Sequence, residues 1–214
     1  MQYLRHLMIT GLSFLFLQCV WADPTQDLQR DLDANQSLTG TFVQTMTADR
    51  VLAPIKSTGR FALKRPGNFY WASDDSSHPL LIIANGKTIF VYDKNLKQVT
   101  VRNQKNTAQS GSPAMFLVGD TKEIVGNYQV SETLNGKQIT YTITPNKKKQ
   151  ANPLFDQLFI TFNIAATEHP ISAMRIIDAL GGVNEISFTR STKKPDEKLF
   201  TFVPPAGVDL VKEH

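Results

Sequence analysis

The stretch Gly59–Trp71 (GRFALKRPGNFYW) holds the residues whose types and spacing point most directly to a binding function. Phe69 and Trp71 are two positions apart, which places both aromatic side chains on one face of a β-strand. Arg65 lies in the turn before them, at the end of that aromatic face. An arginine there is unusual beside an ordinary hydrophobic core, so the stretch predicts a face with a binding role in addition to packing. A surface arginine beside an ordinary core pair is the alternative.

Residues for enzymatic chemistry are few. After the first 22 residues the histidines are His78, His169 and His214. No H-E-x-x-H motif, G-x-S-x-G elbow or EF-hand loop is present. The acidic pair Asp74-Asp75 falls in a serine-rich loop, and Glu168 next to His169 falls in a turn. We therefore expect a protein that is not an enzyme, with no cofactor and no metal site.

Residues 1–22 have the pattern of a cleaved secretory signal. Arg5 lies near the start, an apolar stretch covers residues 7–17, and small residues stand at Val20 and Ala22. The apolar stretch is short for a membrane span, and no stop-transfer pattern follows it. We expect cleavage after Ala22 and export to the periplasm as a soluble protein, with an uncleaved anchor as the alternative.

The mature chain, residues 23–214, is expected to form a single domain. Cys19 is the only cysteine and lies in the signal, so disulfides and cysteine metal sites are excluded from this part. One of the 23 basic residues also lies in the signal, which leaves 22 basic against 19 acidic residues, a net charge of +3. The run 147–149 of lysines lacks interleaved aromatics and indicates a solvated loop. Nucleic acid is therefore not an expected partner.

The elements that position the aromatic face are predicted to be mainly strands. Apolar runs bounded by turn residues predict strands at 38–46, 56–64, 68–72, 80–84, 87–93, 96–102, 127–134, 137–144, 155–163, 171–178 and 183–190. Asn85-Gly86 and Asn135-Gly136 favour tight hairpins. About eleven strands in sequential hairpins form an antiparallel meander, which must curl at that length. Pro204-Pro205 indicates a turn that ends the ladder.

Two short helices accompany these strands. Residues 25–35 place Leu28 and Leu32 one turn apart, and residues 112–119 begin with a capping serine and proline and end with glycine. The strands at 80–83 and 89–92 are apolar on both faces, whereas a simple sandwich layer keeps one face polar. The helices either pack tightly on the curled sheet or leave an apolar hollow beneath them, and composition leaves both open.

Five segments together resemble the LolA family of periplasmic lipoprotein carriers. They are Gly59-x5-Arg65-Pro66-x-x-Phe69-x-Trp71, Asn85-Gly86-Lys87-Thr88-x4-Tyr92-Asp93, Gln98-Val99-Thr100, Ser112-Pro113-Ala114-Met115 and Phe200-Thr201-Phe202-Val203-Pro204-Pro205-x-Gly207-Val208. Each segment is weak alone, but their order and spacing extend over almost the whole mature chain. The resemblance implies an unclosed antiparallel β-barrel with a helical lid over an apolar cavity.

The resemblance also implies roles for particular residues. Arg65 matches the family arginine that hydrogen-bonds the helical lid and keeps the empty cavity closed, which suits a guanidinium with five donors facing unpaired helix carbonyls. Phe69 matches a cavity aromatic, and Trp71 follows on the same face. The full expected lining of the cavity is Phe69, Trp71, Leu28, Leu32, Ile83, Phe90, Tyr92, Met115 and Phe116. Small residues at Ala62 and Ala114, where relatives often carry aromatics, are expected to reshape the hollow.

The implied partners are acylated lipoproteins, an inner-membrane ABC transporter that releases them, and an outer-membrane receptor that accepts them. A monomer is expected. A carrier or sensor of another amphiphile, such as a glycolipid or fatty acid, is the alternative on the same fold. A regulatory sensor of this shape normally carries a further domain, and the outer-membrane acceptor begins with a lipidated cysteine that the mature chain lacks. A closed barrel for a small apolar ligand is a further alternative.

Overall fold

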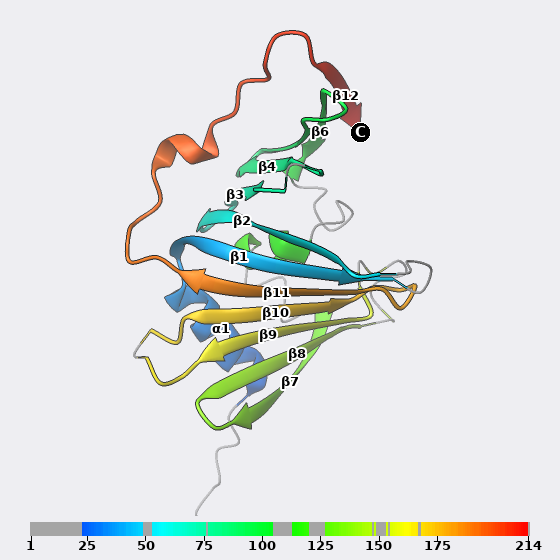
Figure 1. The fold of residues 1–214 in the computed structure, drawn as a ribbon. Helices are drawn as coiled ribbons and strands as arrows, with labels where there is room; N and C mark the ends of the chain where they lie inside the picture. The colour runs from blue at the N-terminus through cyan, green and yellow to red at the C-terminus, as the bar shows by residue number, and fades with distance from the viewer. Residues whose placement is uncertain are drawn as a thin grey trace, which may run out of the picture.

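The computed structural model describes residues 23–48, 53–75, 77–104, 113–119, 127–146, 148, 153, 155–166 and 168–213. The helices are α1 (Pro24–Ala34) and the 3-10 helices η2 (Pro113–Val118) and η3 (Glu197–Phe200). The strands are β1 (Ser37–Thr47), β2 (Ile55–Lys64), β3 (Asn68–Ser73), β4 (Leu80–Asn85), β5 (Thr88–Asp93), β6 (Gln98–Asn103), β7 (Tyr128–Asn135), β8 (Gln138–Pro145), β9 (Gln157–Asn163), β10 (Ile171–Ile177), β11 (Val183–Arg190) and β12 (Asp209–Glu213). All strands belong to one unclosed sheet (Figure 1). The predicted mainly-β, unclosed architecture is confirmed.

The order of strands differs from a simple meander. The sheet has twelve strands in the order β12-β6-β5-β4-β3-β2-β1-β11-β10-β9-β8-β7. The chain does not form a hairpin between β6 and β7, and instead its first and last long strands, β1 and β11, pair antiparallel in the middle of the sheet. The prediction of sequential hairpins is therefore wrong at this one connection, because pairing between strands distant in sequence leaves no turn signal. The other predicted hairpins are present.

The twelfth strand is the one that the sequence did not predict. Pro204-Pro205 lies outside any strand, as expected, but the chain resumes at Asp209 and pairs with β6 in parallel. All five residues of β12 are exposed, so no apolar alternation marks it. Its hydrogen-bonded ladder with β6 and an ion pair of 2.6 Å between Arg102 Nε and Glu213 Oε2 hold it.

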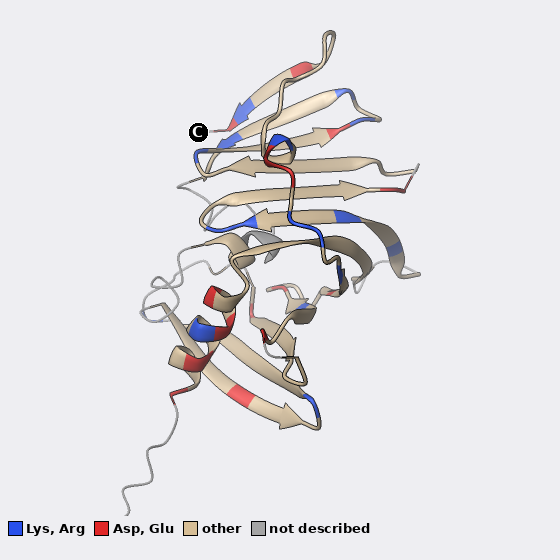
Figure 2. Cartoon of the chain, turned by 90° about the vertical axis from the view of Figure 1, so that its left-hand side faces the viewer, with Lys and Arg blue, Asp and Glu red and all other residues tan. Residues whose placement is uncertain are grey.

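Both predicted helices are present and cover the same side of the sheet, behind it in the view of Figure 1. Helix α1 begins at Asp23, whose carboxylate accepts a hydrogen bond from the Thr25 amide at 2.9 Å. Leu28 and Leu32 are fully buried against the strands. Figure 2 shows charged residues along α1, while most of the sheet is uncharged. No helix in the described ranges is long and apolar enough to cross a membrane.

The register of the strands defines the face that the helices cover, called here the helix face. It carries one continuous cluster of buried side chains from nearly every strand between β1 and β11. The strand residues of the cluster include Leu38, Phe42, Phe61, Leu63, Phe69, Trp71, Ile82, Tyr141, Ile143, Leu158, Ile160, Phe162, Met174, Ile176 and Ile186. Leu117 and Val118 of η2 complete it together with the leucines of α1. The apolar alternation along the strands therefore creates the face on which the helices pack.

The opposite face, called here the outer face, explains why β4 and β5 are apolar on both sides. Strand pairing aligns Ile83 with Tyr70 and with Phe90, so these residues point away from Phe69 and Trp71. The C-terminal segment that carries Phe200 and Phe202 covers them.

Phe202 of this segment lies 5.3 Å from Phe90 and 6.0 Å from Tyr92 between ring centroids, and Phe200 of η3 is buried. Helix η3 packs against β3 and β4. The prediction that Ile83, Phe90 and Tyr92 line the helix-covered side is therefore wrong. They form an outer cluster with Phe200 and Phe202. The sequence alone could not assign faces to strands that are apolar throughout.

Ala62, expected to shape the hollow, also lies on the outer face, where it pairs with Tyr70 and is fully buried. The helix-face neighbours of Ala62 along β2 are Phe61 and Leu63. A bulkier residue at this position would therefore press on the outer face. The side chain of Ala114 lies outside the described residues.

The outer cluster predicts a stability effect of the C-terminal segment. Phe200 is 5% exposed, and a Phe→Ala change at a buried site costs about 3–5 kcal/mol. We expect Phe200→Ala to lower the free energy of unfolding in urea by an amount near the lower end of this range. Val203→Ala in the same segment, where the valine is 80% exposed, should change it by less than about 0.5 kcal/mol. Equal effects of the two changes would contradict a packed outer cluster.

Candidate functional site

The turn between β2 and β3 holds the end of η2 through Arg65. The guanidinium donates from Nη1 to the carbonyl of Leu117 at 3.0 Å and from Nη2 to the carbonyl of Gly119 at 2.7 Å. The backbone of Arg65 is itself fixed, because its amide donates to the carbonyl of Gln36 at 2.8 Å. Carbonyls at the end of a helix lack intrahelical partners. From the β2–β3 turn, Arg65 supplies hydrogen-bond donors to two carbonyls at the end of η2.

A glycine in the same turn adds a third contact. The Gly67 amide donates to the Val118 carbonyl at 2.9 Å, so three successive carbonyls of η2 and its end bind this turn. Gly67 has a φ of +80°, and a Cβ there would lie 2.8 Å from the Cα of Gly86. Only glycine fits this conformation and this close approach. The Arg65-Pro66-Gly67 sequence is therefore shaped to receive η2.

The aromatic pair of the opening stretch lies directly beneath these helices. Phe69 and Trp71 are buried on the helix face, with their ring centroids 6.0 Å apart. Trp71 also stacks on Phe42 of β1, with centroids 3.5 Å apart and an interplanar angle of 17°. Leu28 and Leu32 of α1 belong to the same cluster. The structure thus brings four of the expected lining residues together, and their contact with lipid stays a prediction.

Helix η2 reaches from this aromatic pair toward the far edge of the sheet. Its Phe116 ring lies 5.7 Å from Tyr128 of β7 and 6.2 Å from Phe155, both edge-on. Tyr128 and Phe155 stack at 5.7 Å. The side chain of Met115, also expected in the lining, lies outside the described residues. Helix η2 therefore bridges the β2–β3 turn and the β7 edge.

The hollow between α1 and η2 is small. It has a volume of about 10 Å³ and is lined by Leu32, Asn35, Leu38, Leu63, Arg65, Leu117, Phe162 and Ile171. This is about the space of one water molecule. Of the two arrangements that the sequence left open, the described residues show the packed one. An acyl chain does not fit this hollow as it stands.

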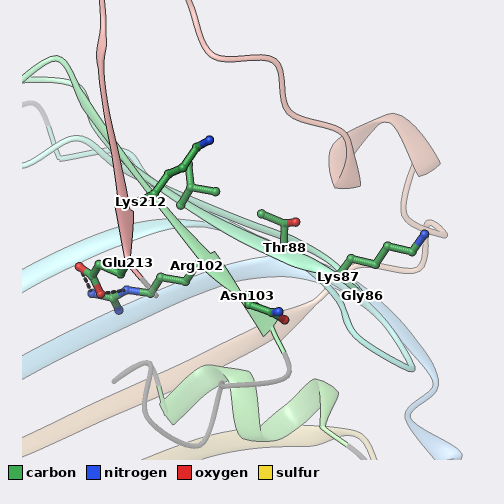
Figure 3. A pocket seen from close by; sticks show the side chains of 8 residues that line it. Gly86, Lys87, Thr88, Arg102, Asn103, Lys212 and Glu213 are labelled. Carbon is green, nitrogen blue, oxygen red and sulfur yellow. Dashed lines mark hydrogen bonds and ion pairs between the residues drawn. The ribbon is translucent and has the colours of Figure 1, made fainter.

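A larger groove of about 540 Å³ lies over β5, β6 and β12, and most of the residues that line it are polar or charged (Figure 3). Lys87 and Lys212 point away from one another, and Arg102 is paired with Glu213. The groove contains none of the residues expected to bind lipid. Its diverging side chains do not converge on a common ligand position.

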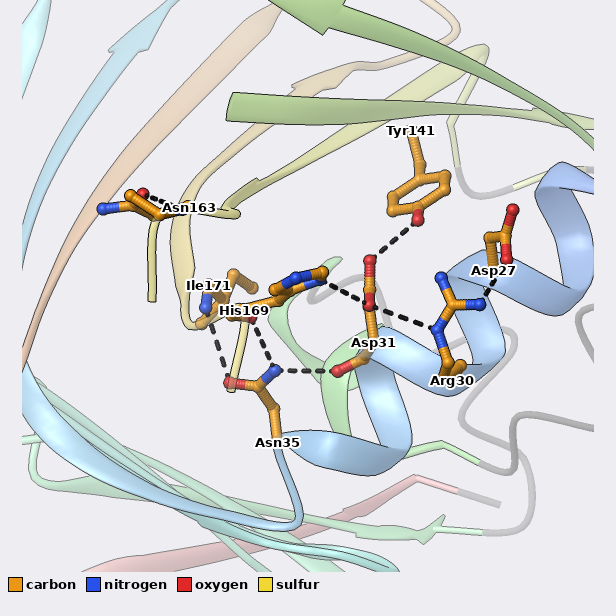
Figure 4. A network of polar contacts seen from close by, with 9 residues as sticks. Asp27, Arg30, Asp31, Asn35, Tyr141, Asn163, His169 and Ile171 are labelled. Atoms are coloured by element: carbon orange, nitrogen blue, oxygen red, sulfur yellow. Dashed lines mark hydrogen bonds and ion pairs between the residues drawn. The ribbon is translucent and has the colours of Figure 1, made fainter. Parts of the chain in front are cut away.

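A buried polar network at the end of α1 was not predicted (Figure 4). Asp31 is 2% exposed, and its carboxylate accepts from the Tyr141 hydroxyl at 2.7 Å. Its other oxygen lies 3.0 Å from Nδ1 of His169. Asn35 at the C-cap donates to the carbonyl of Asp31 at 2.7 Å and to that of His169 at 3.0 Å. We call these four residues the Asp31 network.

Because the carboxylate of Asp31 is buried, it needs hydrogen-bond partners. A buried carboxylate without donors is strongly unfavourable, and a hydrogen bond to a charged group contributes about 1.5–3 kcal/mol. One sequence signal could have revealed the network, since Asp31 follows Leu28 by three positions and so shares the apolar stripe of α1. Tyr141 and His169, however, are too distant in sequence from Asp31 and Asn35 for spacing to connect them.

The network predicts an alkaline dependence of stability. Burial, and next the hydrogen bond to Asp31, raise the pKa of Tyr141. Unfolded tyrosine loses its proton near pH 10, so above this pH the unfolded chain binds fewer protons and the free energy of unfolding falls as pH rises. We expect this decline, limited to about 1.4 kcal/mol per pH unit, to be weaker in Tyr141→Phe during urea titrations between about pH 9 and 11. Identical slopes in the wild type and in Tyr141→Phe would contradict the prediction.

Comparison with known proteins agrees with this geometry. Residues 33–203 match the family model described as outer membrane lipoprotein carrier protein LolA. An outer-membrane lipoprotein carrier protein of Legionella pneumophila (strain Paris) is 34% identical over 188 residues, covering 87% of this chain and 88% of the relative. One of Azotobacter vinelandii is 31% identical over 217 residues and covers both chains completely.

A solved structure shows the same fold at low sequence identity. An uncharacterized conserved protein from Thermus thermophilus superposes with a TM-score of 0.53 at 9% identity, covering 88% of this chain and 98% of that one. This likeness concerns the fold alone. The family model spans most of the sequence, and the relatives exceed 30% identity over nearly full length. The chain therefore belongs to the LolA family of outer membrane lipoprotein carrier proteins.

Proposed function

We propose that the protein carries acylated lipoproteins through the periplasm. It takes them from an inner-membrane ABC transporter and delivers them to an outer-membrane receptor. Membership of the family supports a lipoprotein carrier, and one geometric observation carries the proposal further. Arg65 and Gly67 hold η2 over an aromatic face through three hydrogen bonds to backbone carbonyls. Such a closure can open without disrupting the sheet.

The hydrogen bonds that close η2 offset part of the free energy gained when an acyl chain is buried. Burying one CH₂ group contributes about 0.8 kcal/mol, so a chain of 16 carbons gains roughly 12 kcal/mol when fully buried. A site that kept all of this gain would not release its cargo. The two hydrogen bonds of Arg65 to η2 contribute about 1.5–3 kcal/mol each, and they form again when the lipid leaves. They therefore offset part of the cargo's gain and favour release.

The packed interior determines how loading proceeds. Leu117 and Val118 of η2 are buried on the helix face next to the small hollow. If η2 moves outward, these two side chains leave apolar surface that an acyl chain can cover. Loading is then an exchange of protein contacts for lipid contacts on Phe69, Trp71 and their neighbours. The protein needs no preformed large cavity for this exchange.

The first test asks whether the acyl chains are what binds. An environment-sensitive hydrophobic dye should bind the protein and be displaced by an acylated peptide. The same peptide without its lipid should leave the dye in place. Trp71 is the only tryptophan after residue 22, so its fluorescence should report the exchange on the helix face. Equal displacement by both peptides would reject the proposal, and displacement by free fatty acid or glycolipid alone would favour the other-amphiphile carrier.

The second test concerns closure. Arg65→Leu removes the donors to η2 and leaves the apolar face intact, so the closed state loses stability while the loaded state does not. Losing even one such bond should raise retention of acylated peptide about ten- to hundredfold, and transfer to acceptor membranes should slow accordingly. Arg65→Lys should give a partial defect because lysine keeps the charge without the planar fork.

Arg60→Leu provides the matched control for this change. Arg60 lies on β2, the strand that leads into the Arg65 turn, but its side chain is 68% exposed on the outer face. Its replacement should leave retention and transfer at wild-type levels. Wild-type transfer by Arg65→Leu would show that Arg65 has no part in closure.

A further inference from the structure

The two helices that cover the helix face are held in physically different ways. The contact between Arg65 and Gly119, just after η2, is exposed to solvent, and the contact between Arg65 and Leu117 of η2 is only partly buried. Once separated, the guanidinium and the carbonyl can both bind water. Asp31 of α1, in contrast, is buried together with the Tyr141 hydroxyl that it accepts from. Withdrawing α1 would leave that hydroxyl on the helix face beneath it without its acceptor, and an unsatisfied buried polar group is costly.

The helices are also tied to different parts of the sheet. The end of η2 is bound by the turn between β2 and β3. Helix α1 is bound by Tyr141 of β8 and by His169, which lies just before β10. Asn35 extends this attachment, because its side-chain oxygen accepts from the amide of Ile171 at 3.4 Å. Figure 4 shows these groups converging on the last turn of α1.

The small hollow marks the boundary between the two attachments. Its lining combines Leu32 of α1 with Leu117 of η2, and Arg65 closes one side. Phe162 and Ile171, from the strands that hold α1, complete the lining on the other side. An opening here separates η2 from α1 and exposes the apolar cluster between them.

We propose that the Asp31 network positions α1 as a fixed wall on β8–β10, so that acyl chains enter between α1 and η2 by displacing η2 alone. This inference rests on the proposed lipoprotein carriage. Asp31, Asn35, Tyr141 and His169 are positioning residues, since they act on the cargo only through the placement of α1. The fixed wall keeps Leu28 and Leu32 in place to receive the chains.

Distances between spin labels test this inference directly. With Cys19 replaced by serine, one pair of cysteines at the exposed positions Asp33 and Gln138 reports α1 relative to β8. A second pair at the exposed positions Gly119 and Lys87 reports the end of η2 relative to β5. Pulsed electron spin resonance is recorded with and without the acylated peptide. We expect the peptide to lengthen the Gly119–Lys87 distance and to leave the Asp33–Gln138 distance unchanged.

Single substitutions distinguish the positioning of α1 by the Asp31 network from the closure of η2 by Arg65. Tyr141→Phe removes one hydroxyl with little change of shape, and with peptide bound it should raise the fraction of displaced α1 about tenfold or more and weaken peptide binding to a similar extent. Asp31→Asn keeps a side-chain acceptor and should give an intermediate effect. Tyr92→Phe removes a hydroxyl from the outer face and should match the wild type. Arg65→Leu should free η2 while α1 remains in place.

The outcomes distinguish this inference from the proposed function. If the acylated peptide displaces the dye from the wild type but lengthens the Asp33–Gln138 distance, α1 moves on loading and the inference is wrong while the carrier function stands. If Tyr141→Phe leaves both the α1 distance and peptide binding unchanged, the network does not position α1. If the peptide fails to displace the dye from the wild type, both proposals fall. The wild-type distances decide the question even if a variant does not fold.

Discussion

The structure depends on one constraint, namely that β6 and β7 follow one another in the chain but do not pair. A sheet of this length curls, and without closure its apolar helix face must be covered by something other than another strand. Helices α1 and η2 supply that cover. Because they are attached to the sheet through side chains and the Gly67 amide, and not through a strand ladder, the cover can separate from the sheet while every strand pair remains formed.

The outer cluster allows this separation without loss of the fold. Phe200 and Phe202 pack on strands β3 to β5 from the side opposite η2. These strands therefore have apolar contacts that do not depend on the helix face. The turn that carries Arg65 begins β3, so its position stays defined when η2 leaves. A sheet packed on one face only would lose the order of its binding surface whenever the cover opened.

The sequence predicted local structure well and long-range placement poorly. Alternation located eleven strands and two helices, since each depends on neighbours within a few residues, and the two-residue spacing placed Phe69 and Trp71 on one face. The family resemblance assigned Arg65 to the lid. Alternation could not orient Ile83, Phe90 and Tyr92, because their strands are apolar on both sides. Nor could it find the pairing of β1 with β11, the exposed strand β12 or the Asp31 network, since these join segments far apart in sequence.

The chemistry of the closing contact also suits repeated opening. Arg65 binds the neutral backbone carbonyls of Leu117 and Gly119, and arginine remains protonated throughout the physiological range. Neither of these two acceptors titrates, and the contact with Gly119 breaks at an exposed position, where water can replace it. A buried ion pair in this place would resist opening, since separating its charges in the interior is costly. The exposed contact of Arg65 with Gly119 thus allows η2 to leave, and the buried Asp31 network keeps α1 in place. A carrier needs both properties.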